Sequence, residues 1–368
     1  MKTLGVGIIG YGGFGPFVHN AWSQVEGIEV RMVADTNPAR KPAPGTRFTT
    51  DWNELIADPE IDIVAIVTPP STHAEIAVAA MKAGKHVLVD KPLATTLNDA
   101  KKVIGERDRS GKVAAVNFML RFNPLVETLV SWSRSGLLGK LRHAAVENVA
   151  QDETLPPEHW FWDPEVSGGI LVEHAGHFAD LIDAIAGKHP QSVHGARRTR
   201  NERQEDQLQA TSLYEGGLIV THYHEFSRPR PLETTSIRLV FELAQVDLEG
   251  WIPINGEILA MVSEDSLHTM QTLPGWKLLD NRPADTTENL ITVHSAGNPY
   301  PVSRIVRGSF ALPQVKLEVY AGCLKKMIAD VAEAVRNPKH SVRVPLEDGL
   351  HALDTALQAT DSARKADR

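Results

Sequence analysis

The side chains with the clearest chemical potential lie in one stretch, residues 168–182. It opens with Gly168-Gly169 and continues as an apolar run in which Glu173 and His177 stand four residues apart. This spacing predicts a helix in which both side chains share a face, one turn from each other. A carboxylate beside an imidazole can fix its tautomer and raise its basicity, as a general base requires. A capped helix with a purely structural Glu–His pair is the alternative interpretation.

A second reactive group is the lysine of Asp90-Lys91-Pro92, which directly follows a predicted strand at residues 86–89. Pro92 fixes the turn, and the ammonium of Lys91 then points toward the ligand-binding end of the sheet. There it can hydrogen-bond a substrate hydroxyl and lower the pKa of that hydroxyl. An exposed lysine in a strand–helix loop is the alternative.

A glycine-rich loop predicts a dinucleotide site. The strand at residues 6–9 runs into the pattern G-x-G-x-x-G, whose backbone amides can approach a pyrophosphate at a helix N-terminus. Asp35, at the end of the next strand, is placed to accept a hydrogen bond from a ribose 2′-hydroxyl, which favours NAD over NADP. Arg40 is close enough to leave NADP open. The expected cofactor contacts in the loop are Gly10, Tyr11, Gly12, Gly13, Phe14 and Gly15.

The alternation of apolar strands and helices up to residue 116 predicts an α/β fold with a Rossmann-type, doubly wound parallel sheet. Ligands of such sheets bind beyond the carboxyl ends of the strands, so Thr68, Pro69, His73 and Asp90 are expected near the cofactor. We assign residues 1–123 to an NAD-binding domain.

From residue 142 onward, strands follow one another with little helix between them, which predicts a large, open, mainly antiparallel sheet. We assign residues 124–368 to an α+β domain for substrate binding and oligomerisation. The stretch 281–301 shows little pattern and is expected to be a loop.

Composition narrows the class of protein. The 368 residues carry a net charge of −8, which argues against nucleic acid as a partner. Cys323 is the single cysteine, so no internal disulfide is expected. No stretch is long and apolar enough to predict a membrane span, and we expect a cytoplasmic protein.

Several spaced motifs together resemble the Gfo/Idh/MocA oxidoreductases. They are the glycine loop, residues 68–75, residues 83–94, Arg121-Phe122-Asn123-Pro124, residues 168–177 and residues 346–350. The resemblance spans nearly the whole chain and implies a homodimer or homotetramer. It implies catalytic roles for Lys91, Glu173 and His177.

The resemblance also places Arg121 near the cofactor or substrate and Asn117 near the substrate. Three positions depart from the family pattern. Asp90 stands where the family usually has Glu, Glu173 where it usually has Asp, and His174 where it is usually apolar. We interpret Glu173 and His174 as signs of a substrate unlike simple inositol or glucose.

Further candidates for substrate contact lie later in the chain. Trp160 and Trp162 can stack on a sugar ring, although clustered tryptophans also occur in cores. His222 alternates with His224 along a predicted strand, so the two rings share a face. Arg228 can grip an anionic substituent. A metal site built from these histidines is not required by their spacing, and we assign no metal.

We therefore expect an NAD-dependent oxidoreductase that transfers hydride from a hydroxyl-bearing carbon of a sugar, sugar derivative or cyclic polyol. One alternative is an NAD-dependent glycoside hydrolase that oxidises, eliminates and re-reduces its substrate, which can be anionic. A second alternative is a non-catalytic NAD-binding regulator.

Overall fold

The computed structural model describes residues 2–286 and 290–366, and the strands in these ranges form sheets of six, nine and two strands. The chain folds as two compact units. The first holds the chain up to Phe122 together with Pro157–Asp180 and Tyr320–Leu357, and the second holds the remainder. The division by function near residue 123 stays a prediction. No helix in the described ranges is both long and apolar enough to cross a bilayer.

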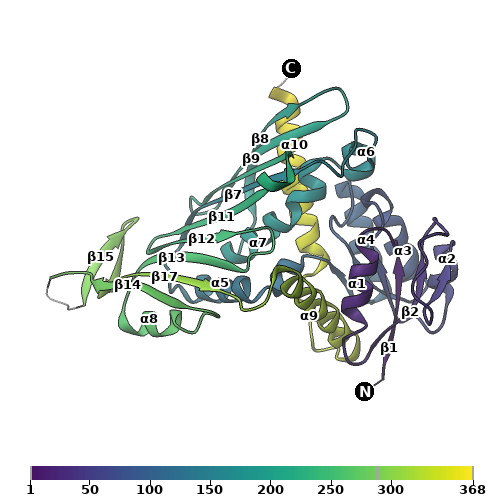
Figure 1. Cartoon of the computed structure of the whole chain (residues 1–368), viewed down its shortest axis with the longest axis horizontal. Helices are drawn as coiled ribbons and strands as arrows, with labels where there is room; N and C mark the ends of the chain where they lie inside the picture. The colour runs from purple at the N-terminus through teal and green to yellow at the C-terminus, as the bar shows by residue number, and fades with distance from the viewer. Residues whose placement is uncertain (1, 287–289, 367–368) are drawn as a thin grey trace. The chain divides into compact units, whose positions relative to one another are not determined.

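The first unit contains the six-stranded sheet, in the order β3-β2-β1-β4-β5-β6 (Figure 1). All neighbouring strands are parallel. The central strands β1 and β4 are buried along their whole length, as expected where helices cover both faces. The predicted parallel α/β sheet is confirmed. Its strands are β1 (Leu4–Ile9), β2 (Ile28–Ala34), β3 (Arg47–Thr49), β4 (Ile63–Ile66), β5 (His86–Val89) and β6 (Ala114–Val116).

Local sequence signals set the helices that connect these strands. The hydroxyl of Thr96 caps the fourth helix by accepting from the Asp99 amide at 3.1 Å, and Gly111 ends that helix with a φ of +65°. These helices are α1 (Gly15–Trp22), α2 (Trp52–Ala57), α3 (His73–Lys82) and α4 (Leu97–Ser110). Two long helices follow late in the chain, α9 (Lys316–Arg336) and α10 (Leu346–Ala366).

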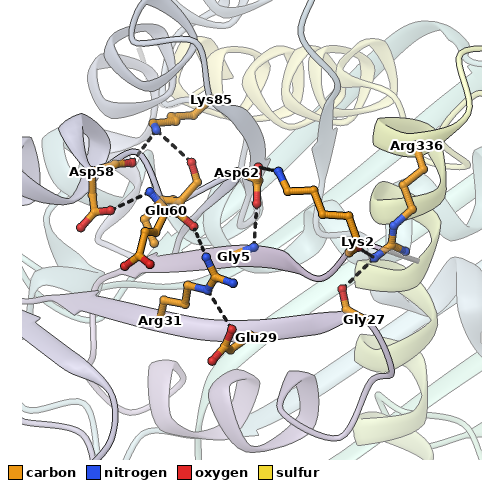
Figure 2. A network of polar contacts seen from close by, with 11 residues as sticks. Lys2, Gly5, Gly27, Glu29, Arg31, Asp58, Glu60, Asp62, Lys85 and Arg336 are labelled. Carbon is orange, nitrogen blue, oxygen red and sulfur yellow. Dashed lines mark hydrogen bonds and ion pairs between the residues drawn. The ribbon is translucent and has the colours of Figure 1, made fainter.

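A network of polar contacts fastens the amino ends of the parallel strands. The ammonium of Lys85 donates to the backbone carbonyls of Asp58 and Ile61, at 2.6 and 2.9 Å. The Asp62 carboxylate accepts from the Gly5 amide at 2.8 Å. These contacts leave the opposite edge of the sheet for ligands. The network is drawn in Figure 2 with Lys2, Gly5, Gly27, Glu29, Arg31, Asp58, Glu60, Asp62, Lys85 and Arg336 labelled.

The second unit is built on the nine-stranded sheet, in the order β14-β17-β13-β12-β11-β7-β10-β9-β8 (Figure 1). Its neighbours are antiparallel apart from β7 and β10, which run parallel, so the mainly antiparallel sheet is confirmed. The strands are β7 (Leu141–Gln151), β8 (Pro190–Thr199), β9 (Glu205–Tyr214), β10 (Ile219–Arg228), β11 (Thr234–Phe241), β12 (Ala244–Glu249), β13 (Asn255–Val262), β14 (Lys277–Pro283) and β17 (Arg304–Ala311). The helices α5 (Pro124–Ser135) and α8 (Glu264–Met270) also belong to this unit.

The loop expected at residues 281–301 is wrong in part. The segment includes the end of β14 and a hairpin of β15 (Ile291–Ser295) and β16 (Asn298–Val302), while residues 287–289 lie outside the described residues. The hairpin turns at Ala296 and Gly297, both with positive φ (48° and 82°), as a type I′ turn requires. The Glu242 carboxylate then accepts from Asn298 and Tyr300 and so holds β16 in place.

Replacing Gly10 with alanine is predicted to destabilise the protein. Gly10 has a φ of +96°, and an added Cβ would lie 2.5 Å from the carbonyl oxygen of Val67. Strain of this kind costs about 1–3 kcal/mol of the free energy of unfolding, which urea denaturation measures. Gly13→Ala is the matched control, because an added Cβ there meets nothing within 4 Å. Equal stabilities of the two variants would contradict this account.

Candidate active site

The residues expected to bind the cofactor gather at the carboxyl edge of the parallel sheet. Gly10 follows β1, Thr68 and Pro69 come just after β4, Asp90 follows β5, and Asn117 follows β6. Parallel strands all end at this edge, and open α/β sheets bind their ligands there. The structure therefore brings these predicted positions together, as the sequence suggested.

The glycine loop between β1 and α1 leaves its backbone open to a ligand. An added Cβ on Gly13 would meet no atom within 4 Å, and one on Gly12 would meet only the Arg40 guanidinium. At the close end of the loop, an added Cβ on Gly15 would lie 2.6 Å from the carbonyl oxygen of Gly10. The loop is thus tight against the protein at Gly15 and open at Gly12 and Gly13, which fits a pyrophosphate.

Asp35 fixes the conformation of this loop. Its carboxylate accepts from the backbone amide of Tyr11 at 2.7 Å and from that of Asn37 at 2.8 Å. The Arg40 guanidinium lies 3.4 Å from the same carboxylate. Asp35 is therefore held beside the loop, at the position from which a ribose hydroxyl would be bound. That contact, like those of Tyr11 and Phe14 with the cofactor, stays a prediction.

Lys91 and Glu173 form a nearly buried ion pair. The Lys91 ammonium donates to the Glu173 carboxylate and to the Glu173 backbone carbonyl, both at 2.6 Å. Each side chain is 14% exposed. Burial alone would raise the pKa of Glu173, but chiefly the Lys91 ammonium holds it below its usual value. Glu173 is thus a carboxylate in the resting protein, and two of the three ammonium donors of Lys91 are occupied.

The expected pairing of Glu173 with His177 is wrong. Residues Leu171–Ala175 form a π-helical segment, and the regular helix α7 (Gly176–Ala186) begins only after it. The Lys91 ammonium, 2.6 Å from the Glu173 carboxylate, offers it a charged partner, whereas the buried His177 ring is neutral. Glu173 turns to Lys91 instead. Among the described residues, Nδ1 of His177 is buried with no hydrogen-bond partner.

Burial keeps the two histidines of this segment uncharged. Burial, then the nearby Lys91 ammonium and His174, holds the pKa of His177 well below its usual range. Burial likewise lowers the pKa of His174 to about 4. The ring of His177 packs edge-on against Phe118, with centroids 5.9 Å apart. At neutral pH His177 is therefore a neutral imidazole that can accept a proton. The described residues contain no group of three or more side chains arranged for a metal ion.

Asp90 and Asn117 make a second polar pair beside Lys91. The amide nitrogen of Asn117 donates to the Asp90 carboxylate at 2.9 Å. Burial raises the pKa of Asp90 to about 6. The amide oxygen of Asn117 is buried with no hydrogen-bond partner among the described residues, so it can accept from a ligand. This geometry is compatible with the predicted substrate contact of Asn117, which stays a prediction.

His73 bridges two backbone carbonyls. Its Nδ1 lies 2.7 Å from the carbonyl oxygen of Pro92, and its Nε2 lies 2.8 Å from that of Thr68. The side chain is fully buried, and burial lowers its pKa. His73 therefore links the loop after β4 to the turn that carries Lys91. Its expected contact with the cofactor stays a prediction.

Arg121 is engaged with two carboxylates. Its guanidinium donates twice to Asp180 and once to Asp348, each at 2.8 Å. Sequence reasoning assigned no role to either aspartate. Asp348 lies within the motif at residues 346–350, and Asp180 lies one turn after His177. Their positions in the sequence could therefore have marked both aspartates as candidate site residues. Contact of Arg121 with cofactor or substrate stays a prediction.

The remaining substrate candidates differ in exposure. In the first unit, Trp160 is 37% exposed with its ring tilted against that of His159, whereas Trp162 is buried edge-on against Phe161. Only Trp160 thus presents a surface to a ligand. In the second unit, His222 and Arg228 both lie on β10. His222 is buried, and Arg228 is half exposed with its guanidinium 3.4 Å from the Glu225 carboxylate.

Acid is predicted to destabilise the protein through His222. Burial lowers the pKa of His222 to about 4, below its unfolded value of 6.5. Between these values the unfolded chain binds more protons, so the free energy of unfolding falls as pH falls, by about 1.4 kcal/mol per pH unit. Urea denaturation measures how far the free energy of unfolding decreases between pH 6.5 and pH 5. This decrease should be about 2 kcal/mol smaller in His222→Gln than in the wild-type protein. In His194→Gln, at an exposed histidine of the same unit, the decrease should equal that of the wild-type protein. A wild-type loss in His222→Gln as well would refute this assignment.

Comparison with known proteins gives the family. Residues 4–118 match the description "Oxidoreductase family, NAD-binding Rossmann fold", and residues 126–243 match "GFO/IDH/MocA C-terminal domain". A levoglucosan dehydrogenase from Pseudarthrobacter phenanthrenivorans is 31% identical over 205 residues, which are 51% of this chain and 52% of that one. A glycosyl hydrolase family 109 protein from Porphyromonas gingivalis is 26% identical over 269 residues, 63% of this chain and 57% of that one. The chain thus spans little more than half the length of these curated relatives.

A solved structure of levoglucosan dehydrogenase, in complex with NADH and levoglucosan, has a TM-score of 0.76 to this chain. It is 19% identical and covers 98% of this chain and 97% of that one, which shows the shared fold. The two family matches together cover more than half of the sequence, and the glycine loop, the Lys91 turn and the His177 helix stand where their motifs predicted. The chain belongs to the GFO/IDH/MocA family of oxidoreductases and carries an NAD-binding Rossmann fold.

Proposed function

We propose that this protein is an NAD-dependent dehydrogenase that oxidises a hydroxyl of a sugar, a sugar derivative or a cyclic polyol. The observation that carries the proposal is the buried pairing of Lys91 with Glu173, beside a neutral His177, at the carboxyl edge of the parallel sheet. These groups supply a positive charge and a proton acceptor close to where an open α/β sheet binds its ligand.

Lys91 stabilises the oxygen that becomes negative during oxidation. Glu173 fills two of its ammonium donors, through its carboxylate and its backbone carbonyl. The third N–H donates to the substrate hydroxyl, where it lowers the pKa of that hydroxyl and favours the alkoxide. The pairing also restrains a flexible side chain, so the donor is oriented before the substrate arrives.

His177 takes the hydroxyl proton. Its low pKa keeps the ring neutral near pH 7, so it begins the reaction as a base. The O–H proton moves to the imidazole as the substrate carbon is oxidised to a carbonyl. The glycine loop and Asp35 would hold NAD, which would supply the hydride acceptor when bound. The levoglucosan dehydrogenases among the similar proteins support a carbohydrate substrate.

The glycosyl hydrolase family 109 relative favours one further candidate function, an NAD-dependent glycosidase. In that reaction, transient oxidation would acidify the neighbouring C–H, the aglycone would leave by elimination, water would add to the resulting unsaturated ketone, and hydride would then return to the carbonyl carbon. Glu173 and His174 would provide the additional acid–base groups. A regulator that binds NAD without turnover is the remaining alternative.

The same proposal includes the roles of the two domains, the oligomeric state and the cellular location of the enzyme. Residues 1–123 bind the cofactor, and residues 124–368 bind substrate and form a homodimer or homotetramer in the cytoplasm. Five large apolar side chains on strands in the described part of the second unit are exposed and support such an assembly: Leu213, Ile219, Leu259, Leu278 and Leu279.

Absorbance of reduced nicotinamide, recorded with NAD and a panel of sugars, polyols, and neutral and anionic glycosides, tests the proposal. One class of compound should give NADH in proportion to substrate consumed. Lys91→Ala should lower kcat by about 100-fold or more, because the developing alkoxide loses its charge partner. Lys102→Ala, which removes an exposed ammonium paired with Asp99, should leave kcat unchanged.

A parallel assay of released aglycone separates the alternatives. Aglycone release without accumulation of NADH would replace the dehydrogenase with the glycosidase. Absence of both signals, with NAD bound, would replace it with the regulator.

A further inference from the structure

The short segment after β6 lies between the two parts of the proposed reaction centre, the loop that carries Lys91 and the helix α7 that carries His177. Asn117 donates to Asp90, the neighbour of Lys91, and its backbone amide donates to the Val89 carbonyl at 2.7 Å. The following 3-10 turn, η2 (Met119–Phe122), carries Arg121. One turn of chain is therefore anchored to the Lys91 loop at its start and faces helix α7 at its end.

Two side chains of this segment hold the first turn of α7. The Phe118 ring lies edge-on against the His177 ring and leaves only 3.5 Å to an added Cβ on Gly176. Three residues later, the Arg121 guanidinium grips Asp180 with two parallel hydrogen bonds. His177 and Asp180 are three residues apart on one helix and share a face. The contacts thus fix α7 at two points, one on each side of a single turn.

Asp348 anchors Arg121 from a third element. Its carboxylate, near the start of α10, accepts from Nη2 of Arg121 at 2.8 Å. The Arg121 backbone is held as well, because its carbonyl accepts from Arg343 at 3.0 Å. The Arg121 side chain is 12% exposed, Asp180 1% and Asp348 18%. A planar guanidinium bound by one bidentate carboxylate and by a second carboxylate is held in one orientation, unlike a lysine at the same place.

We propose that the triad of Arg121, Asp180 and Asp348 positions His177 for proton transfer, with Arg121 as a positioning residue rather than a ligand of cofactor or substrate. This inference rests on the proposed function. It gives a common role to two sequence motifs, at residues 121–124 and 346–350, that the proposed reaction leaves without one.

Kinetics of Arg121→Lys and Arg121→Ala provide the first test. Displacement of a reacting group by about 1 Å costs about 100-fold in rate, so kcat should fall by about 10- to 100-fold. KM for substrate and the affinity for NADH should change less than about threefold, because binding is left intact. Guanidinium ion at about 20 mM, far below denaturing concentrations, should restore part of kcat in Arg121→Ala but not in Arg121→Lys.

The chain offers a matched control in Arg107. Its guanidinium also makes a bidentate pair with a carboxylate of α10, at 2.8 and 2.7 Å from Glu347, but it reaches no residue of α7. Arg107→Ala should lower the melting temperature as a lost ion pair does and leave kcat unchanged. An equal loss of kcat in the Arg107 and Arg121 variants would reduce the triad to a general stabilising contact and overturn the proposal.

A spectroscopic readout makes the test independent of turnover. With ¹³Cε1-labelled histidine, the signal of His177, assigned by its loss in His177→Gln, reports the position of its ring against Phe118. Arg121→Lys should shift this signal, and Arg107→Ala should not. If the wild-type protein oxidises no substrate, the proposed function fails while this shift still decides the positioning role. An unshifted His177 signal in both Arg121 variants would overturn the inference.

Discussion

The contact between the Lys91 ammonium and Glu173 determines the character of the proposed reaction centre. It joins the turn after β5 to a segment 82 residues later in the chain. Both side chains are largely withdrawn from water, so each charge depends on the other for its stability. The ammonium keeps the carboxylate ionised, and its charge adds to burial in keeping His177 neutral. One ion pair thus influences the protonation of both the carboxylate and the imidazole in the proposed reaction centre.

The parallel sheet separates stability from chemistry. At its amino edge, carbonyls and carboxylates of the connecting loops are bonded to Lys85, Arg31 and backbone amides, as Figure 2 shows. At its carboxyl edge, the segments that follow the strands hold polar atoms that can contact a ligand, among them the amide oxygen of Asn117. The closely packed apolar strands between the two edges hold the loops in fixed positions. Substitutions at the two edges therefore act on different properties of the protein.

Sequence reasoning succeeded where a signal is local. The glycine loop, the lysine before a proline and the strand–helix alternation each depend on residues close together in the chain, and the structure confirms the elements that they predicted. Sequence reasoning failed at the helix that carries Glu173. It predicted a regular helix with a Glu173–His177 pair, whereas residues 171–175 are π-helical and Glu173 pairs with Lys91, which is distant in the chain.

Long-range partners were also out of reach. Arg121 meets Asp180 and Asp348 at separations of 59 and 227 residues, and no periodicity in one sequence encodes such a meeting. The hairpin at residues 291–302 was overlooked because its strands are short and its turn uses Ala296 rather than Asn or Asp. The roles assigned to individual site residues are hypotheses based on the sequence and on the structure together.

The imidazole of His73 adds an asymmetry to this arrangement. Burial lowers its pKa, so near neutral pH the ring carries a single N–H, yet a carbonyl oxygen lies within 2.8 Å of each nitrogen. Only one of the two neighbouring loops can then be hydrogen-bonded to the ring at a time. When the proton is on Nδ1, the ring secures the turn that carries Lys91, and when it is on Nε2, the ring secures the loop after β4. The choice of tautomer at one buried ring therefore decides which of the two loops is held more firmly.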